Sequence, residues 1–536
     1  GIFRLLGSMF TSYKTWWLNL VQKDPVHVLI ETLLISFLAY LLLYQKKKDY
    51  RRKMQDRLSD DEIRDLLIDW KENGRVPLSA DRDTLMNGAG DVADIEKKTK
   101  RSPMEDVIIE RMSGSKVDIS MGVGKNSSSR PRSPSSKRTV LNFATHDFLG
   151  SACPAKKDVS TDVDVIKEAA IEALSKYGCG SCGPRGFYGT IDAHLDLEDE
   201  MAKFTNTDGA ILYSDGASCS SSTVASFAKR GDLLIVDEGV YEALGTGVTL
   251  SRANVKYFKH NDMNDLRRVL ERVQATDESL GRKLNDQRRF IVVEALYKNY
   301  GTVCPLDELV KLKEEFCYRL ILDESISFGT MGKTGRGALE HFGLKPMQHA
   351  EIICIGLENA MGSIGGITVG NEEVVDHQRL SGAGYCFSAS LPPFLATASK
   401  ANLKRLETQP EVLGSLKENI AFFYKTLNSI SAKGTTLIPN KLVVTSDEGL
   451  SPMVYLQLAD QALTREEQIE LLDLIALKCL EDGVFIVSTG NHVNHHLHKI
   501  PPPMLRLTIM AKQNKTDICT AITVLKDAVV SAMKGR

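Results

Sequence analysis

The chain has 536 residues, of which 43% are hydrophobic and 25% are charged, and its formal net charge is −2. This composition excludes a disordered protein and is sufficient for two or more packed domains. The near-neutral charge excludes the overall basic field that is typical of nucleic-acid-binding proteins.

The first predicted element is a membrane anchor. Residues 26–44 form an apolar run whose only charged residue is Glu31, and its length is close to the roughly 20 residues that cross a bilayer. The basic residues between Lys46 and Lys53 keep this end on the cytoplasmic side. We therefore expect an uncleaved, single-pass transmembrane helix over residues 25–45, with the C-terminal part in the cytosol. A buried soluble helix is the alternative that Glu31 and the modest length favour.

The segments on either side of the anchor are predicted to be peripheral. In residues 1–24, apolar residues recur at helical spacing, which indicates an interfacial amphipathic segment. Residues 46–138 are charged and then rich in Ser, Pro and basic residues, which predicts a tether with a solvated insert near residues 126–136. A short amphipathic helix is predicted within the tether, from Asp60 to Glu72.

The rest of the chain alternates strand-like and helix-like patterns, which predicts an α/β fold with a mainly parallel sheet. The strand-like runs are residues 232–237, 289–293, 318–323 and 351–355, and helical patterns include residues 163–177 and 306–316. We assign this large domain to residues 139–398. Strand patterns near residues 442–444, 453–456 and 505–508 and a helical pattern over residues 465–480 predict a smaller α+β domain over residues 399–536.

The segment Tyr177–Gly189 has the highest density of glycine, and it contains the only CxxC, formed by Cys179 and Cys182. A helix precedes it where a dinucleotide-binding fold needs a strand, so its GxGxxG does not predict a nucleotide site. A single CxxC also makes a poor zinc site, and we expect no bound metal. The glycines instead predict a loop whose backbone approaches another surface, with Arg185 and Tyr188 as its large side chains.

Several blocks in the same order resemble the α-oxoamine synthases, a family of fold type I enzymes that depend on pyridoxal phosphate (PLP). The blocks are Asp147-Phe148-Leu149-Gly150, Arg185-x-x-x-Gly189-x-x-x-x-His194-x-x-Leu197-Glu198, Asp323-Glu324 and Gly332-x-x-Gly335-Arg336-Gly337. The resemblance covers about two-thirds of the chain, from Asn142 to Arg506. It implies the PLP-dependent aminotransferase-like fold for the large domain.

The same resemblance implies a degenerate cofactor site. Asp323 matches the carboxylate that binds the pyridine nitrogen of PLP. The family's two histidines fall on Tyr241 and Ile326, and its Schiff-base lysine falls on Asn359, whose carboxamide nitrogen cannot form an imine. Arg506 matches the carboxylate-binding arginine, either as a functional residue or as a relic that pairs internally. We therefore expect no covalently bound cofactor and no activity of this chain alone.

Within the family, five segments most closely resemble a membrane-anchored subunit of this degenerate type. They are Cys182–Gly189, Phe258–Met263, Glu358–Ala360, and Asp376–Gly382 together with Tyr385–Pro393. The resemblance implies an endoplasmic-reticulum complex that condenses L-serine with palmitoyl-CoA to 3-ketosphinganine, the first step of sphingolipid synthesis. PLP is expected on a catalytic second subunit, in one heterodimer or a dimer of heterodimers. A small activating subunit and Orm-type regulators are further expected partners.

In such a dimer, this chain is expected to line the partner's active site with Cys182, Arg185, Tyr188, Ser388 and Ser390. The alternative is that the glycine-rich loop only packs the interface. Two other functions stay open. One is a self-sufficient PLP enzyme that uses a displaced lysine, Lys298 or Lys333, and the other is a purely structural membrane scaffold.

Overall fold

The computed structural model describes Phe37, Tyr40 and residues 107–121, 137–152, 162–181, 183–429, 441–460, 462–490 and 497–534. The chain divides into two compact units, Gly1–Thr99 and Lys100–Arg536. In the part of the chain that is described, no helix has the length and apolarity that crossing a membrane requires. The interfacial segment, nearly all of the predicted anchor, the Asp60–Glu72 helix and the Ser-rich insert lie outside the described residues and stay predictions.

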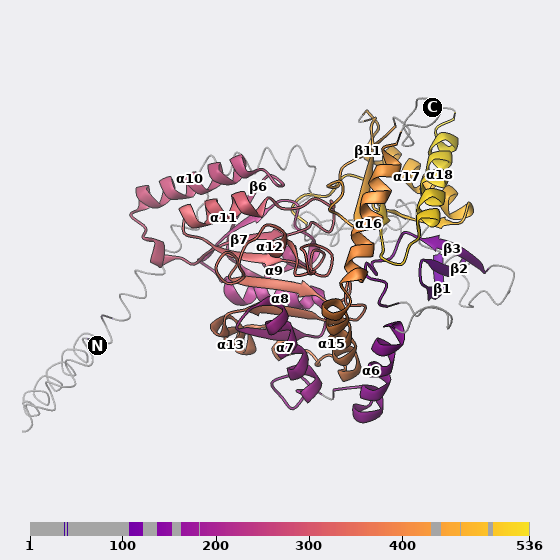
Figure 1. The fold of residues 1–536 in the computed structure, drawn as a ribbon. Coiled ribbons are helices and arrows are strands. Elements are labelled where there is room, and N and C mark those ends of the chain that lie inside the picture. Colours follow the sequence, from indigo (N-terminus) through magenta and orange to yellow (C-terminus); the bar gives the residue numbers. More distant parts are fainter. Residues whose placement is uncertain are drawn as a thin grey trace, which may run out of the picture. The chain divides into compact units, whose positions relative to one another are not determined.

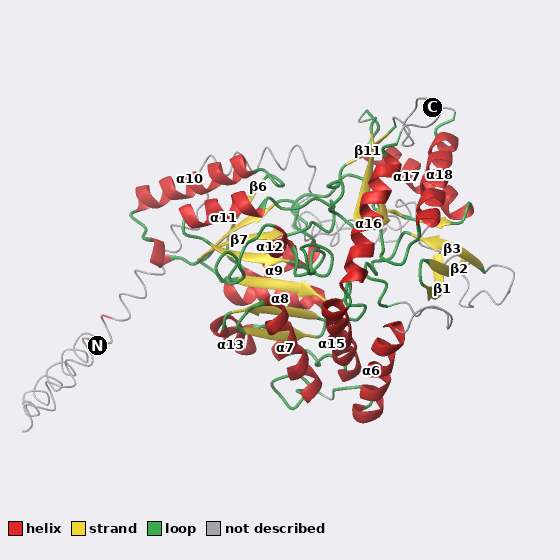
Figure 2. Ribbon diagram, viewed as in Figure 1, coloured by secondary structure: helices red, strands yellow, loops and turns green. Residues whose placement is uncertain are grey.

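The second unit contains a seven-stranded sheet with the strand order β4-β10-β9-β8-β7-β5-β6 (Figures 1 and 2). Its strands are β4 (Gly209–Tyr213), β5 (Leu233–Asp237), β6 (Asn254–Phe258), β7 (Arg289–Glu294), β8 (Arg319–Asp323), β9 (Ile352–Gly356) and β10 (Gly366–Gly370). Strands β5 to β9 run parallel, and only β10 is antiparallel to its neighbours β4 and β9. The prediction of a mainly parallel sheet is confirmed.

Helices flank this sheet, connect its strands or pack on the flanking helices. They are α6 (Asp162–Tyr177), α7 (Asp192–Thr205), α8 (Gly216–Phe227), α9 (Glu242–Ser251), α10 (Met263–Leu280), α11 (Leu306–Glu315), α12 (Ala338–His341), α13 (Glu372–Ser381), α14 (Ala383–Cys386) and α15 (Pro393–Thr408). Helix α8 packs against α9, β9 and β10, whereas α10 packs against α11 and β6 (Figure 1). The sheet is thus enclosed by helices, as the apolar strands require.

The central strands are continuous apolar runs because both of their faces are buried. Every residue of β5 and of β7 is buried, and each strand ends in an acidic residue, Asp237 and Glu294. The next parallel strand, β8, ends in Asp323, which is in register with Glu294. The carboxyl ends of parallel strands lie at one edge of the sheet, so the fold gathers these three carboxylates there.

The smaller domain is an antiparallel sheet with the order β11-β12-β15-β14 and three helices. Its elements are β11 (Leu442–Val444), β12 (Met453–Leu458), β14 (Val487–Ser488), β15 (Leu505–Thr508), α16 (Pro410–Leu427), α17 (Arg465–Glu481) and α18 (Lys515–Ala532). Helix α17 begins with a capping box, in which Thr464 and Glu467 satisfy each other's backbone N–H groups. The α+β prediction is confirmed, although α15 runs without interruption across the boundary predicted at residue 399.

A third sheet, with the order β1-β2-β3-β13, corrects part of the predicted tether. Its strands are β1 (Val107–Ser113), β2 (Lys116–Met121), β3 (Arg138–Asn142) and β13 (Val484–Phe485). Strand β2 alternates polar residues with Val117 and Ile119, which are each 1% exposed. This alternation is the pattern of a strand with one buried face, and the surrounding charged residues concealed it in the sequence.

Candidate functional site

The candidate site is built at the carboxyl edge of the large sheet, where a buried aspartate meets two hydroxyl groups. Asp323 is 2% exposed, and its Oδ2 atom lies 2.6 Å from Ser220 Oγ and 3.0 Å from Tyr241 OH. The two hydroxyl oxygens are 2.8 Å apart, and the backbone N–H of Ser325 donates to Asp323 Oδ1 at 2.9 Å. Burial, followed by the charge of Asp323, raises the pKa of Tyr241 well above its usual value, so its hydroxyl stays protonated.

The local sequence positions these hydroxyls. The carboxylate of Asp215 accepts a hydrogen bond from Ser218 N at 2.7 Å and caps α8, so Ser220 lies in the first turns of that helix. Tyr241 follows the turn after β5, and its backbone N–H donates to Glu294 Oε1 at 2.7 Å. Glu294 is itself buried, and burial together with Asp323 raises its pKa well above the usual value.

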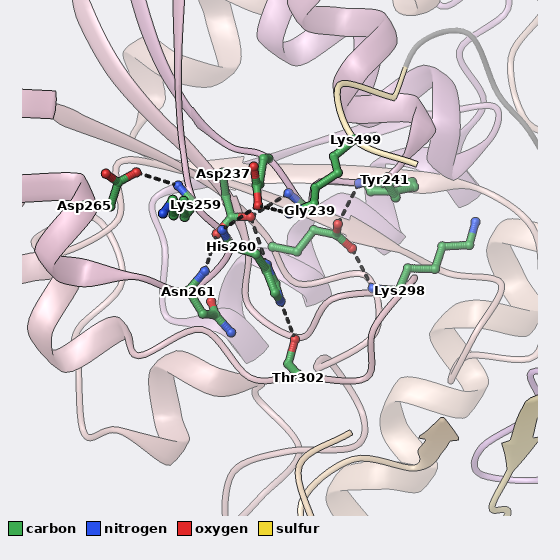
Figure 3. A network of polar contacts seen from close by, with 12 residues as sticks. Asp237, Gly239, Tyr241, Lys259, His260, Asn261, Asp265, Lys298, Thr302 and Lys499 are labelled. Atoms are coloured by element: carbon green, nitrogen blue, oxygen red, sulfur yellow. Dashed lines mark hydrogen bonds and ion pairs between the residues drawn. The ribbon is translucent and has the colours of Figure 1, made fainter. Parts of the chain in front are cut away.

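The turn that carries Tyr241 is fixed by a polar network centred on Asp237 (Figure 3). Asp237 accepts hydrogen bonds from Gly239 N at 2.7 Å and Asn261 N at 2.9 Å. His260 lies between Asp237 and Thr302, with ring nitrogens 2.9 Å from Asp237 Oδ1 and 2.8 Å from Thr302 Oγ1. Because Asp237 is fully buried, these contacts hold the backbone of the turn in one conformation.

Asn359 follows β9 and uses both ends of its carboxamide inside the protein. Its Nδ2 donates to Ser325 O at 2.9 Å, which fixes the orientation of the amide. Its Oδ1 then accepts from Nδ1 of His146 at 3.3 Å. Asn359 is 5% exposed, and its backbone oxygen accepts from Phe148 N at 3.1 Å. The residue that aligns with the family's lysine therefore has its side-chain amide and its backbone oxygen hydrogen-bonded within the protein.

The remaining predicted residues of the degenerate site differ in their surroundings, because Arg506 has a buried Nε atom with no hydrogen-bond partner among the described residues and Ile326 is apolar. Ile326 is 2% exposed and belongs to the hydrophobic core. Arg506, on β15, donates from Nη2 to Ala144 O at 2.9 Å, and it forms no ion pair with any described residue. Of the predicted residues, Tyr241 is hydrogen-bonded to Asp323, and Asn359 is hydrogen-bonded to Ser325, two residues after Asp323.

His146 was missed by sequence reasoning, and so were Ser220 and Glu294, because none of them belongs to a motif. Since Asn359 Oδ1 can only accept, Nδ1 of His146 carries the proton in the neutral ring, and Nε2 has no partner. Burial, then the charges of Arg506 and Lys298, lower the pKa of His146 well below 6.5.

We expect His146→Gln to flatten the acid side of the stability profile. A lowered folded-state pKa means that the unfolded chain binds more protons below about pH 6.5, so stability falls by about 1.4 kcal/mol per pH unit as the pH decreases. Glutamine is a polar side chain of similar size that does not titrate. Thermal midpoints of the two proteins between about pH 7 and pH 5.5 should diverge in slope, and identical slopes would contradict this assignment.

The glycine-rich loop between α6 and α7 is closed by internal contacts. Arg185 is 5% exposed and its Nη1 and Nη2 atoms lie 2.8 and 2.9 Å from the two carboxylate oxygens of Glu198. Ser390 donates from N and from Oγ to Gly183 O, each at 2.9 Å, and Ser181 Oγ donates to Ser390 O at 2.7 Å. These contacts bind the polar groups of Arg185 and Ser390 within this chain, and their place in a partner's site stays a prediction.

The outward side of the loop has a different character. Tyr188 is fully exposed with a left-handed φ of 66°, and Ser388 Oγ lies 3.2 Å from Ser214 Oγ. We define the outer patch as the exposed aromatic side chains on and next to the loop: Phe187 (63%) and Tyr188 (103%) on the loop itself, and Phe387 (84%), which lies three residues before Ser390. Cys182 lies outside the described residues. In the described part of the chain, no cluster of His, Cys, Asp and Glu is placed to hold a metal ion.

Comparisons of the sequence with known proteins identify its family. Residues 148–525 match the family described as aminotransferase class I and II. The chain is 37% identical to long chain base biosynthesis protein 1c of Oryza sativa subsp. japonica, covering 95% of this chain and 92% of that protein. It is 35% identical to serine palmitoyltransferase 1 of Dictyostelium discoideum, covering 95% and 94% of the two chains.

Among solved structures, the chain is similar to a serine palmitoyltransferase from S. paucimobilis that carries a PLP-myriocin aldimine. The TM-score is 0.66 with 22% sequence identity, and the match covers 85% of this chain and 99% of the other. At this identity the likeness establishes the fold, which is the PLP-dependent aminotransferase-like fold.

Proposed function

The chain belongs to the aminotransferase class I and II family and, within it, to the serine palmitoyltransferases, and from this we propose that it is the non-catalytic first long-chain-base subunit. The complex would condense L-serine with palmitoyl-CoA, with loss of CO2, to give 3-ketosphinganine. This chain would complete and stabilise the active site of a second subunit that carries PLP.

The observation that carries the proposal is Asn359 and its surroundings. PLP acts as an electron sink when it is held through an imine to a lysine and through a carboxylate to its pyridine nitrogen. Here a carboxamide with both ends hydrogen-bonded occupies the lysine position. The carboxylate of Asp323 is occupied by the hydroxyls of Ser220 and Tyr241. The residues present therefore do not fit a covalently held PLP.

Lys298 is the amine that a self-sufficient enzyme would have to use. Its Nζ atom lies 5.1 Å from the centre of the Tyr241 ring, on the side of the ring that cation–π contacts use. The Tyr241 hydroxyl is bound to Asp323, the carboxylate that would hold the pyridine nitrogen of a cofactor. This placement favours the silent-subunit proposal over a displaced Schiff base.

The outer patch supports a partner-bound state. Exposed aromatic side chains on a rigid loop are typical of protein–protein interfaces. Since fold type I dimers have their active sites at the subunit interface, as the resemblance implies, a homologous lysine-bearing subunit is the partner that this face fits. Tyr188 and Ser388, together with Cys182, would then face the partner's site, while Arg185 and Ser390 hold the loop in shape.

In this arrangement, the chain's residues act by positioning and by exclusion of water. The loop of residues 183–189, fixed by Ser390 and the Arg185–Glu198 pair, would present Tyr188 as one wall of the partner's site.

A helix over residues 25–45 would hold the complex at the endoplasmic-reticulum membrane as a single-pass anchor. Both palmitoyl-CoA and the long-chain ketone partition into bilayers, so this location shortens their path. A small activating subunit and Orm-type regulators belong to the same proposal.

The direct test is to express the lysine-bearing subunit in membranes with and without this chain. We expect 3-ketosphinganine from serine and palmitoyl-CoA only with both chains, and the two should co-purify. Full activity of the partner alone would favour a structural scaffold. Product formed by this chain alone would favour a self-sufficient enzyme.

A further inference from the structure

We propose that Tyr241 is a built-in occupant of the former cofactor site, so that a lysine restored at position 359 would not by itself recover PLP binding. The inference rests on the proposed silent subunit and adds a second, independent barrier. Loss of the lysine removes the covalent bond to the cofactor. Tyr241 removes the space and the carboxylate that the cofactor's ring would use.

The carboxylate of Asp323 is already bound by other hydrogen-bond donors. A pyridine nitrogen needs an uncommitted oxygen of Asp323 in order to stay protonated. Oδ2 of Asp323 already contacts two hydroxyl oxygens, at 2.6 Å and 3.0 Å, and Oδ1 accepts the backbone N–H of Ser325. These donors satisfy the buried aspartate, so removing them would be costly unless another donor replaced them.

Three contacts fix the position of Tyr241. Its hydroxyl is anchored at Asp323, its backbone N–H is bound by Glu294, and the ammonium of Lys298 lies over its face. The side chain is only 7% exposed. Displacing the ring into solvent would therefore break a hydrogen bond to a charged group and a cation–π contact at once.

The backbone of the turn that carries Tyr241 is also fixed by hydrogen bonds. Asp237 accepts the N–H of Gly239, two residues before Tyr241, and His260 ties Asp237 to Thr302 on a neighbouring segment (Figure 3). The turn is thus anchored at both ends, by Asp237 and by Glu294. A small backbone shift that would free the site is opposed by several buried hydrogen bonds.

The alternative is that Tyr241 only fills core volume and moves aside for the cofactor once a lysine is present at position 359. The two hypotheses predict different cofactor binding by the single variant Asn359→Lys. If Tyr241 is an occupant, Asn359→Lys alone stays without cofactor, and the site opens only when the phenol is also replaced by a smaller ring. If Tyr241 is a passive filler, Asn359→Lys alone is sufficient.

The experiment uses the complete complex, in which the partner's own PLP serves as an internal standard. Complexes with wild-type chain, Asn359→Lys, Tyr241→His/Asn359→Lys and Tyr241→Ala/Asn359→Lys are incubated with excess PLP and reduced with borohydride. Peptide mass spectrometry then measures the pyridoxyl adduct at position 359 relative to the partner's adduct. Tyr241→Phe/Asn359→Lys is the matched control, because it removes the hydroxyl and keeps the ring.

We expect the adduct at position 359 to be near background in Asn359→Lys and in the Tyr241→Phe control, and to increase by about tenfold or more when histidine or alanine replaces Tyr241. An adduct in Asn359→Lys alone that equals the partner's would overturn the inference. So would its absence from both double variants in complexes that assemble normally by gel filtration. An adduct on the wild-type chain would instead contradict the proposed silent subunit.

Discussion

Gly189→Ala is expected to lower 3-ketosphinganine production by the complex by about tenfold or more, equivalent to at least about 1.4 kcal/mol in the activation barrier. A Cβ atom at Gly189 would lie 1.9 Å from Gly183 O and 2.6 Å from Pro184 O. Both are backbone atoms of the same loop, so no side-chain adjustment can relieve the clash. The loop that presents Tyr188 would have to open. The measurement is product formation by the purified complex at saturating serine and palmitoyl-CoA.

Gly186→Ala is the matched control within the same loop. A Cβ atom at Gly186 meets nothing within 4 Å, and this glycine does not adopt a left-handed φ. Its product formation should stay within about twofold of the wild type, because an exposed methyl group changes little. Equal loss of activity in both variants, or full activity in Gly189→Ala, would reject the role of the loop's shape.

Arg185→Leu is expected to destabilise the complex by about 3–5 kcal/mol, because it leaves the buried charge of Glu198 without its partner. Glu198 is 5% exposed, and its Oε1 also accepts the backbone N–H of Leu212 at 2.7 Å. The carboxylate therefore cannot move to solvent without breaking a second buried hydrogen bond. The thermal midpoint and the yield of assembled complex report the loss.

The companion variant Arg185→Leu/Glu198→Gln separates lost charge from lost packing. Glutamine keeps an oxygen for Leu212 N but removes the uncompensated charge, so the double variant should be more stable than Arg185→Leu alone. A double variant that is equally or more destabilised would mean that the ion pair is not what holds the loop.

The residues that carry the candidate site were predictable where a motif fixes their position along a strand. Asp323 ends the apolar strand β8, Tyr241 lies four residues after Asp237 at the end of β5, and Asn359 follows β9 in a small, glycine-rich segment. Strand ends in a parallel sheet converge, so three positions far apart in sequence meet at one edge. The resemblance to the α-oxoamine synthases identified the three positions, and the alternation of strands and helices placed them at that edge.

Other parts of the site depend on tertiary contacts that no local pattern encodes. Ser220 and His146 are brought to the site by a helix and a loop whose sequences resemble many others. The family resemblance predicts that Arg185 and Ser390 line a partner's site, but it does not predict which groups of this chain they bind. Whether a side chain on a loop points in or out depends on its partners, and here Glu198 and Gly183 turn both inward.

The account is tested most directly by locating PLP in the wild-type complex. The complex is reduced with borohydride, both chains are digested, and pyridoxyl-lysine is mapped by mass spectrometry. We predict one adduct, on the partner subunit, and none on any lysine of this chain. A pyridoxyl adduct on Lys298, the amine beside the Tyr241 ring, or on another lysine of this chain would contradict the account.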